Sequence, residues 1–296
     1  MIPLIRTENK KSDLYLVLPD VGTEVQRETP DRDEQRVVRS PSGKFIAFST
    51  FDDPFWSVWI AESNGAESRV SEGKLEVVDF ALSPDDKALF LLERGSEGIL
   101  SGSVIRIASK ERQRIASDIQ EARWLRDGRG IATLSKNEKG QSELAIRLRN
   151  LDGTFGEPTA LSSAVWSFVG ETGGSAFLVF AEFDGVLDLA TLDSTGTLAR
   201  VGNISLPKTT GVTGELSADS TSLVYALDDQ QSGQKLLVYS LASKTSQTIS
   251  ENGFDVRIID ESVLYKEVQG STTTVMVYDL RSDSAKRVSE KDGLTY

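Results

Sequence analysis

Two pairs of adjacent aspartates are the residues of this 296-residue chain that most resemble a chemical site. Asp52-Asp53 lies in FSTFDDPFWSVWIAESNG (48–65), and Asp228-Asp229 lies in a later polar stretch. Paired carboxylates bind calcium in some proteins and act as the two acids of glycosidases in others. Neither pair has the alternating acidic spacing of a calcium loop, and adjacent residues of an extended strand point to opposite sides. We therefore expect no metal site and no paired catalytic acids.

The composition excludes most other catalytic centres. The chain has no cysteine and no histidine, so it lacks thiolate nucleophiles, sulfur and imidazole metal ligands, and the base of Ser-His-Asp or Cys-His catalysis. The segment GGSAF (173–177) begins like a nucleophile elbow but lacks the closing glycine. The sequence also lacks the glycine-rich phosphate-binding motifs. We predict that the chain is not an enzyme and needs no cofactor.

Charge argues against nucleic acid as a partner. The net charge is −12, which repels a phosphate backbone unless a local basic face overcomes it. The strongest basic run is KERQR (110–114), followed by Arg123, Arg126 and Arg129. Lys and Arg are common on exposed strands, where they oppose edge-to-edge pairing. We interpret this run as such a strand edge.

The chain has no sequence signal for membrane insertion. No run approaches the roughly 18 apolar residues of a spanning helix, and MIPLIRTENKKSDLYLVLP (1–19) lacks the regions of a signal peptide. Met1–Leu4 resembles a strand more than a natural leader. This start is compatible with a leader or anchor that has been removed.

A repeat runs along the whole chain. Four strong copies are RSPSGKFIAFS (39–49), LSPDDKALFLL (82–92), LRDGRGIATLS (125–135) and LSADSTSLVYAL (216–227), and two weaker ones are TGGSAFLVF (172–180) and IDESVLYKE (259–267). Their spacing of about 40 to 46 residues is that of propeller blades. In each unit an apolar strand precedes the turn, and two further short strands follow it. Helical periodicity is nearly absent. The pattern predicts four strands per unit.

We therefore predict an all-β fold, a seven-bladed β-propeller of four-stranded antiparallel blades. The terminal GLTY (293–296) is expected to supply the first strand of the N-terminal blade and so to close the ring. The whole chain, 1–296, is then a single domain. Its blades are expected at approximately 1–30 with 292–296, 34–72, 76–117, 120–162, 164–203, 211–250 and 253–290.

The repeated turn residues have a structural reason. Asp or Ser followed by Gly supports a tight turn, and Pro presets the backbone angle before it. Ser83, Pro84 and Asp85, and likewise Asp127 and Gly128, are interpreted as turn residues and not as paired acids.

Three copies of the repeat resemble the WD40-like repeat of TolB-type propellers. They are SPSGKFIAFS followed by SVWIAESNG, then SPDDKALFLL, and then LSADSTSLVYAL followed by LLVYSLASK. The resemblance covers nearly the whole chain, and the unit at 173–174 has lost the motif. It implies a periplasmic or extracellular envelope protein that binds protein partners without catalysis. Similar blades occur in the propeller of prolyl oligopeptidase-like peptidases, so a substrate-gating domain of a larger peptidase is an alternative. A carbohydrate-binding envelope protein is another.

The candidate partner-binding residues are aromatic and apolar side chains in two neighbouring loops. Trp59 aligns with Tyr239 and Tyr278 of later units, whereas Phe51 and Phe55 align with polar residues. Together with Asp52 and Asp53, these two phenylalanines are expected in a loop between the second and third strands of one blade. Ile99 and Leu100 are expected in the equivalent loop of the next blade. Exposed apolar groups rimmed by charge often mark an interaction site. The alternative is that Phe51 and Phe55 only cap their own blade.

The partner's identity is not specified by this pattern. We expect a protein partner, no nucleic acid and no membrane insertion, and a chain that is a monomer or part of a larger assembly.

Overall fold

The computed structural model describes residues 2–8, 11–18, 23–26, 34–52, 55–62, 66–73, 75–137, 139–172, 176–207, 211–217, 219–229, 233–259, 261–269, 272–289 and 294–295. They form β-strands joined by turns, so the predicted all-β class is confirmed. Within these ranges, no helix has the length and apolar character to cross a membrane.

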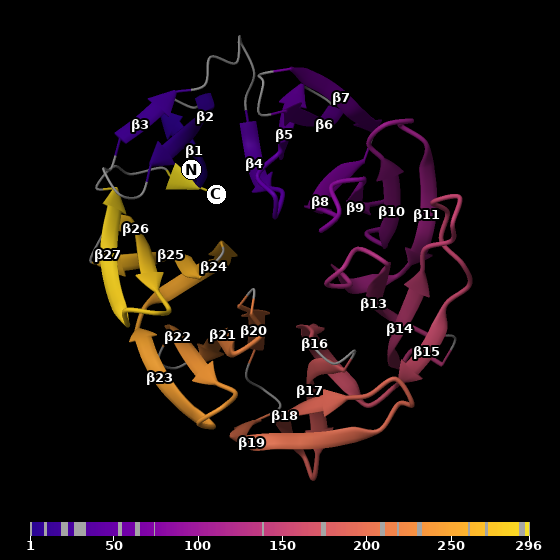
Figure 1. Cartoon of the computed structure of the whole chain (residues 1–296), viewed down its shortest axis with the longest axis vertical. Helices are drawn as coiled ribbons and strands as arrows, with labels where there is room; N and C mark the ends of the chain where they lie inside the picture. Colours follow the sequence, from indigo (N-terminus) through magenta and orange to yellow (C-terminus); the bar gives the residue numbers. More distant parts are fainter. Residues whose placement is uncertain are drawn as a thin grey trace. The chain divides into compact units, whose positions relative to one another are not determined.

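The first compact unit comprises Met1–Ser135, Arg147–Pro158 and Gly293–Tyr296 and contains three whole four-stranded sheets (Figure 1). One has the order β28 (Leu294–Thr295), β1 (Ile2–Glu8), β2 (Lys11–Leu18), β3 (Thr23–Gln26). The second consists of β4 (Glu34–Arg39), β5 (Phe45–Asp52), β6 (Phe55–Glu62) and β7 (Glu67–Gly73). The third consists of β8 (Glu76–Leu82), β9 (Ala88–Arg94), β10 (Leu100–Arg106) and β11 (Arg112–Ser117).

The second compact unit comprises Lys136–Ile146 and Thr159–Asp292 and also contains three whole sheets. The first is β16 (Val165–Glu171), β17 (Phe177–Phe183), β18 (Val186–Leu192) and β19 (Leu198–Pro207). The next is β20 (Gly211–Leu216), β21 (Ser222–Asp229), β22 (Gly233–Ser240) and β23 (Thr245–Ser250). The last is β24 (Gly253–Ile259), β25 (Ser262–Gln269), β26 (Thr272–Asp279) and β27 (Ser284–Ser289).

One further sheet, β12 (Ile119–Trp124), β13 (Gly130–Lys136), β14 (Ser142–Leu148) and β15 (Thr159–Ser162), has strands assigned to both units. Among the described residues, six blades each lie wholly within one unit, three in each. The structure therefore shows six complete blades and not the seven predicted. The sequence repeat locates strands and turns, but it carries no information about where the chain divides into compact units. Four antiparallel strands per blade are confirmed.

The middle strands of a blade are apolar on both faces, because each packs against neighbours on two sides. In β9, Leu89 and Leu91 join a buried cluster with β5 and β6. Phe90 and Leu92 of the same strand join a different buried cluster with β12 and β13. Successive side chains of a strand point to opposite faces, so one strand supplies two cores. Burial of each such side chain contributes about 1.5–3 kcal/mol to stability.

The predicted repeat turns are confirmed. In each strong repeat, the N–H of the fourth turn residue donates to the carbonyl of the first, in the pairs Gly43–Ser40, Asp86–Ser83, Gly128–Leu125 and Ser220–Ser217. Ser83 Oγ accepts the Ala88 N–H at 2.9 Å and donates to Asp85 Oδ1 at 2.7 Å. The Arg129 N–H donates to Asp127 Oδ1 at 2.9 Å. The aspartates therefore stabilise turns, as their positions predict.

The C-terminal strand β28 pairs antiparallel with β1, with Ile5 opposite Thr295 and Arg6 opposite Leu294 (Figure 1). The expected use of the last strand to complete the N-terminal sheet is thus confirmed.

Candidate functional site

The first predicted loop is a tight connection between β5 and β6. Phe51 pairs with Trp56 in the strand register, and their ring centroids are 5.1 Å apart at an interplanar angle of 59°. The backbones of Asp52 and Phe55 pair at the end of this hairpin, but their side chains lie outside the described part of the structure. Asp53 lies outside the described residues altogether. Phe51 therefore keeps a specific aromatic neighbour while remaining 38% exposed.

The second predicted loop, between β9 and β10, is a short closed turn. The Gly95 N–H donates to the Ile99 carbonyl at 2.9 Å, and the Gly98 N–H donates to the Gly95 carbonyl at 2.9 Å. Ile99 is 45% exposed. Leu100 instead packs against the buried cluster that contains Phe90. Of the two apolar residues predicted here, Ile99 faces solvent and Leu100 contributes mainly to the core.

Strand pairing corrects the alignment on which the comparison of Trp59 depends. Trp59 pairs with Phe48, whereas Tyr225, the repeat equivalent of Phe48, pairs with Leu237. The predicted equivalence of Trp59 and Tyr239 is therefore wrong by two residues. A strand pattern repeats every two residues, so it cannot distinguish one register from another shifted by two.

In the observed register, Trp56 is equivalent to Leu100. Phe51 pairs with Trp56, and Arg94 pairs with Leu100 in the next blade. Ile99, which precedes Leu100, is then equivalent to Phe55, which precedes Trp56 in the preceding blade. The two predicted loops are thus structural equivalents on neighbouring blades.

Sequence reasoning missed one residue at the same end of these blades. Leu75, in the connection from β7 to β8, is 36% exposed. Successive strands of a blade run in opposite directions, so the second-to-third connection and the connection into the next blade leave from the same end. That rule would have placed Leu75 at the same end of the blades as the two predicted loops. We call Phe51, Trp56, Leu75 and Ile99 the apolar loop end.

The turn aspartates at the opposite end are held as carboxylates. Partial burial opposes ionisation of Asp85, but the Ser83 hydroxyl and the charge of Arg149 lower its pKa below the usual value. Arg149 Nη1 lies 2.6 Å from Asp85 Oδ2. For Asp219, hydrogen bonds from the Ser217 hydroxyl and the Thr221 N–H lower the pKa. The described residues contain no group of three or more acidic side chains placed to hold a metal.

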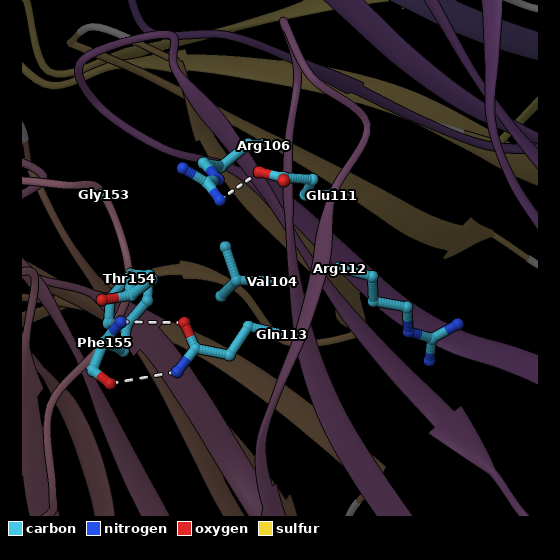
Figure 2. Close-up of a pocket in the computed structure, with 8 residues that line it drawn as sticks. All are labelled: Val104, Arg106, Glu111, Arg112, Gln113, Gly153, Thr154 and Phe155. Atoms are coloured by element: carbon cyan, nitrogen blue, oxygen red, sulfur yellow. Dashed lines mark hydrogen bonds and ion pairs between the residues drawn. The ribbon is translucent and has the colours of Figure 1, made fainter.

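A pocket of about 380 Å³ lies in the first unit between strands β10 and β11 and the loop that follows β14 (Figure 2). Gln113 lies on one side and Phe155 on the other. The Gln113 amide donates to the Phe155 carbonyl at 3.0 Å and accepts the Phe155 N–H at 2.8 Å. Arg106 forms an ion pair with Glu111 at the rim. The pocket is lined by Val104, Arg106, Glu111, Arg112, Gln113, Gly153, Thr154 and Phe155.

Four-stranded antiparallel blades in repeated succession, with loops at both ends, define this chain as a β-propeller. No family profile matches the sequence, and no curated protein sequence is similar to it.

The fold is similar to that of TolB from Acinetobacter baumannii, with 14% identity and a TM-score of 0.63 over 99% of this chain and 64% of TolB. It is also similar to the β-propeller domain of the Trilobed protease from Pyrococcus furiosus, with 13% identity and a TM-score of 0.68 over 99% and 98%. A third similar structure is Pyrococcus horikoshii acylaminoacyl peptidase, with 13% identity and a TM-score of 0.71 over 98% and 50%. The chain thus spans about half to two thirds of TolB and the peptidase. At this identity the likeness concerns the fold.

Proposed function

We propose that this chain is a non-catalytic β-propeller that binds a protein partner through the apolar loop end. The observation that carries the proposal is the exposure of Phe51, Leu75 and Ile99 at the same end of two consecutive blades. Exposed apolar side chains grouped in this way are typical of interaction sites, and aromatic residues are frequent binding hot spots. The predicted residues Asp52, Asp53 and Phe55 flank them in the chain, and Leu100 supports Ile99 from the core.

The Phe51–Trp56 pair supports this role. Phe51 packs on one neighbour and keeps more than a third of its surface in water. A side chain held by an aromatic contact loses little conformational freedom when a partner covers it, so more of the contact energy appears as affinity. The lack of histidine and cysteine supports a binding role over catalysis.

A site-specific photocrosslinker tests the binding site. The crosslinker is placed at Ile99 in the wild type and in a Phe51→Ser variant, and both are exposed to envelope and soluble fractions of source cells. We expect one dominant crosslinked protein that the Phe51→Ser variant loses while melting like the wild type. A crosslinker at the exposed Lys44, in the β4–β5 turn at the opposite end of the blade, is the matched control. The same adduct at both positions, or its retention in Phe51→Ser, would contradict the proposal.

The second candidate is the propeller domain of a larger peptidase. The match over 98% of the Trilobed protease propeller domain favours it. The mass of the native protein, read by immunoblot of source cells, separates the two candidates. A native protein about twice this mass that reacts with a fluorophosphonate probe would support the peptidase. A native protein near 32.3 kDa without such labelling would support the scaffold.

An envelope location, periplasmic or extracellular, is part of the proposal. It rests on the likeness to TolB. Fractionation of source cells tests it: recovery with cytoplasmic markers would contradict it.

A further inference from the structure

The first unit contains a basic region within an acidic chain. Its residues 105–135 and 147–150 include nine Lys and Arg but four Asp and Glu, whereas the whole chain has 33 and 45. The rest of the chain is therefore more acidic than its net charge suggests.

The loop after β14 projects a leucine from this region. Leu151 is fully exposed (111%), and Leu148, at the end of β14, is 50% exposed. Both lie at the end of the blades opposite the apolar loop end, since the third-to-fourth connections leave from the other end of each blade. Because both side chains are exposed, they contribute little to the core and are accessible to a partner.

The loop that carries Leu151 is fixed by a dense set of contacts. The Gly153 N–H donates to the Asn150 carbonyl at 3.0 Å, and Asp152 Oδ1 accepts the Thr154 N–H at 2.8 Å. Arg106 Nη1 donates to the Asp152 carbonyl at 2.8 Å. Leu151 is therefore presented by an ordered turn.

The base of the loop is equally constrained. The Arg149 guanidinium lies 5.5 Å from the Trp124 ring centroid and 5.4 Å from that of Phe155, and it pairs with Asp85. A loop that is ordered before binding avoids the entropy cost of ordering on binding.

The pocket beside this loop combines an apolar floor with a charged rim that includes two arginines, Arg106 and Arg112, and one glutamate, Glu111 (Figure 2). Val104 and Phe155 are buried at its base. Arg106 at its edge pairs with the exposed Glu111. An exposed pair of this kind contributes little to stability, so Arg106 can exchange Glu111 for another carboxylate at small cost.

We propose that this surface, formed by Leu151, Leu148, Arg106 and the Gln113–Phe155 pocket, binds an acidic peptide segment that carries an apolar side chain. The carboxylates of the peptide pair with Arg106 and the neighbouring basic side chains, and its apolar residue packs between Leu151 and the pocket. A short acidic segment fits the limited basic area, whereas a nucleic acid would extend its charge over the acidic remainder of the chain. The site is independent of the proposed function, because it lies at the opposite end of the blades.

An array of short random peptides tests the proposal, probed with the full chain and with Leu151→Ser. We expect the strongest binders to contain several Asp or Glu residues and a Leu, Ile or Phe. In solution, the best peptide should bind Leu151→Ser or Arg106→Gln about fivefold or more weakly, the effect of losing one interface anchor. It should also bind more weakly as salt rises from about 0.05 to about 0.3 M.

Ile99→Ser is the matched control, because it removes an exposed apolar side chain from the opposite end. It should leave peptide affinity unchanged while affecting only the proposed partner site. Binders without acidic enrichment, or equal binding by the wild type and Leu151→Ser, would overturn the proposal. Tighter binding of a single-stranded DNA of equal length than of the best peptide would also overturn it, in favour of a general polyanion surface.

Discussion

The Gln113 side chain and the Phe155 backbone exchange two hydrogen bonds, at 3.0 and 2.8 Å, across 42 residues of sequence. Gln113 belongs to β11 and Phe155 to the loop after β14, so the contact joins two segments of the first unit that are distant in the sequence. The Phe155 ring is buried in the cluster that also contains Phe90 and Ile131. An amide side chain here takes the place of a neighbouring strand, since it satisfies both polar groups of one residue.

Gln113→Ala should destabilise the chain by about 1–3 kcal/mol. The change leaves the N–H and the carbonyl of Phe155 without their partner, and unsatisfied buried polar groups cost about that much. Urea unfolding followed by tryptophan fluorescence measures the effect. Gln234→Ala, which truncates an exposed glutamine on β22, is the control and should change stability little. Equal losses in the two variants would show that the Gln113 bonds contribute nothing specific.

Asp85→Asn should lower stability at neutral pH by about 1–2 kcal/mol, because Arg149 loses its charged partner in a partly exposed setting. The folded state lowers the pKa of Asp85 below its usual value of 3.8. The ionised carboxylate therefore stabilises the fold above about pH 3.8, and this contribution is lost as the pH falls toward the lowered pKa.

Urea unfolding at pH 7 and at successive values down to about pH 3 measures this dependence. The stability difference between wild type and Asp85→Asn should be constant near neutrality and should shrink in acid. Glu97→Gln, in the exposed β9–β10 connection, serves as the charge-matched control. A difference that stays constant to pH 3 would mean that the Asp85 charge is not involved.

Gly128→Ala should be more destabilising than Gly140→Ala. Both glycines have φ +73°, so each alanine incurs the same backbone strain of about 1–2 kcal/mol. At Gly128 a new Cβ would also lie 3.0 Å from Asp85 Cγ, whereas nothing lies within 4 Å at Gly140. The crowding adds about 1 kcal/mol or more. Thermal melts of the two variants give the comparison, and identical melting temperatures would contradict the close approach of the two turns.

Much of the fold follows from the sequence. The repeat of Ser-Pro-Asp or Ser-Gly turns locates the first hairpin of the strong units, because the same residues cap the same turn each time. The pairing of the last strand with β1 follows from counting strands. The register of the third strands does not follow, since Trp59 and Tyr239 fit an alternating pattern equally well in two alignments. The division of the sheet from β12 to β15 between units has no local sequence signal.

The candidate site was predictable only in part. Phe51 and Ile99 are apolar where the pattern expects polar residues, and the structure finds both exposed. Leu100 fits the same sequence criterion but is drawn into the core, because β10 already begins at Leu100, three residues before the loop composition ends. The exposure of Leu151 depends on the contacts of Arg106 and Arg149 with distant residues, which no local pattern contains.

The pairing of β28 with β1 also sets an order of events during synthesis. Ile5 leaves the ribosome some 290 residues before its partner Thr295 is made. Contacts of such long sequence separation form slowly, because the entropy of closing a long loop is lost before the contacts contribute favourable free energy. The sheet that begins the chain is therefore the last to be completed, and until then β1 exposes an unpaired edge.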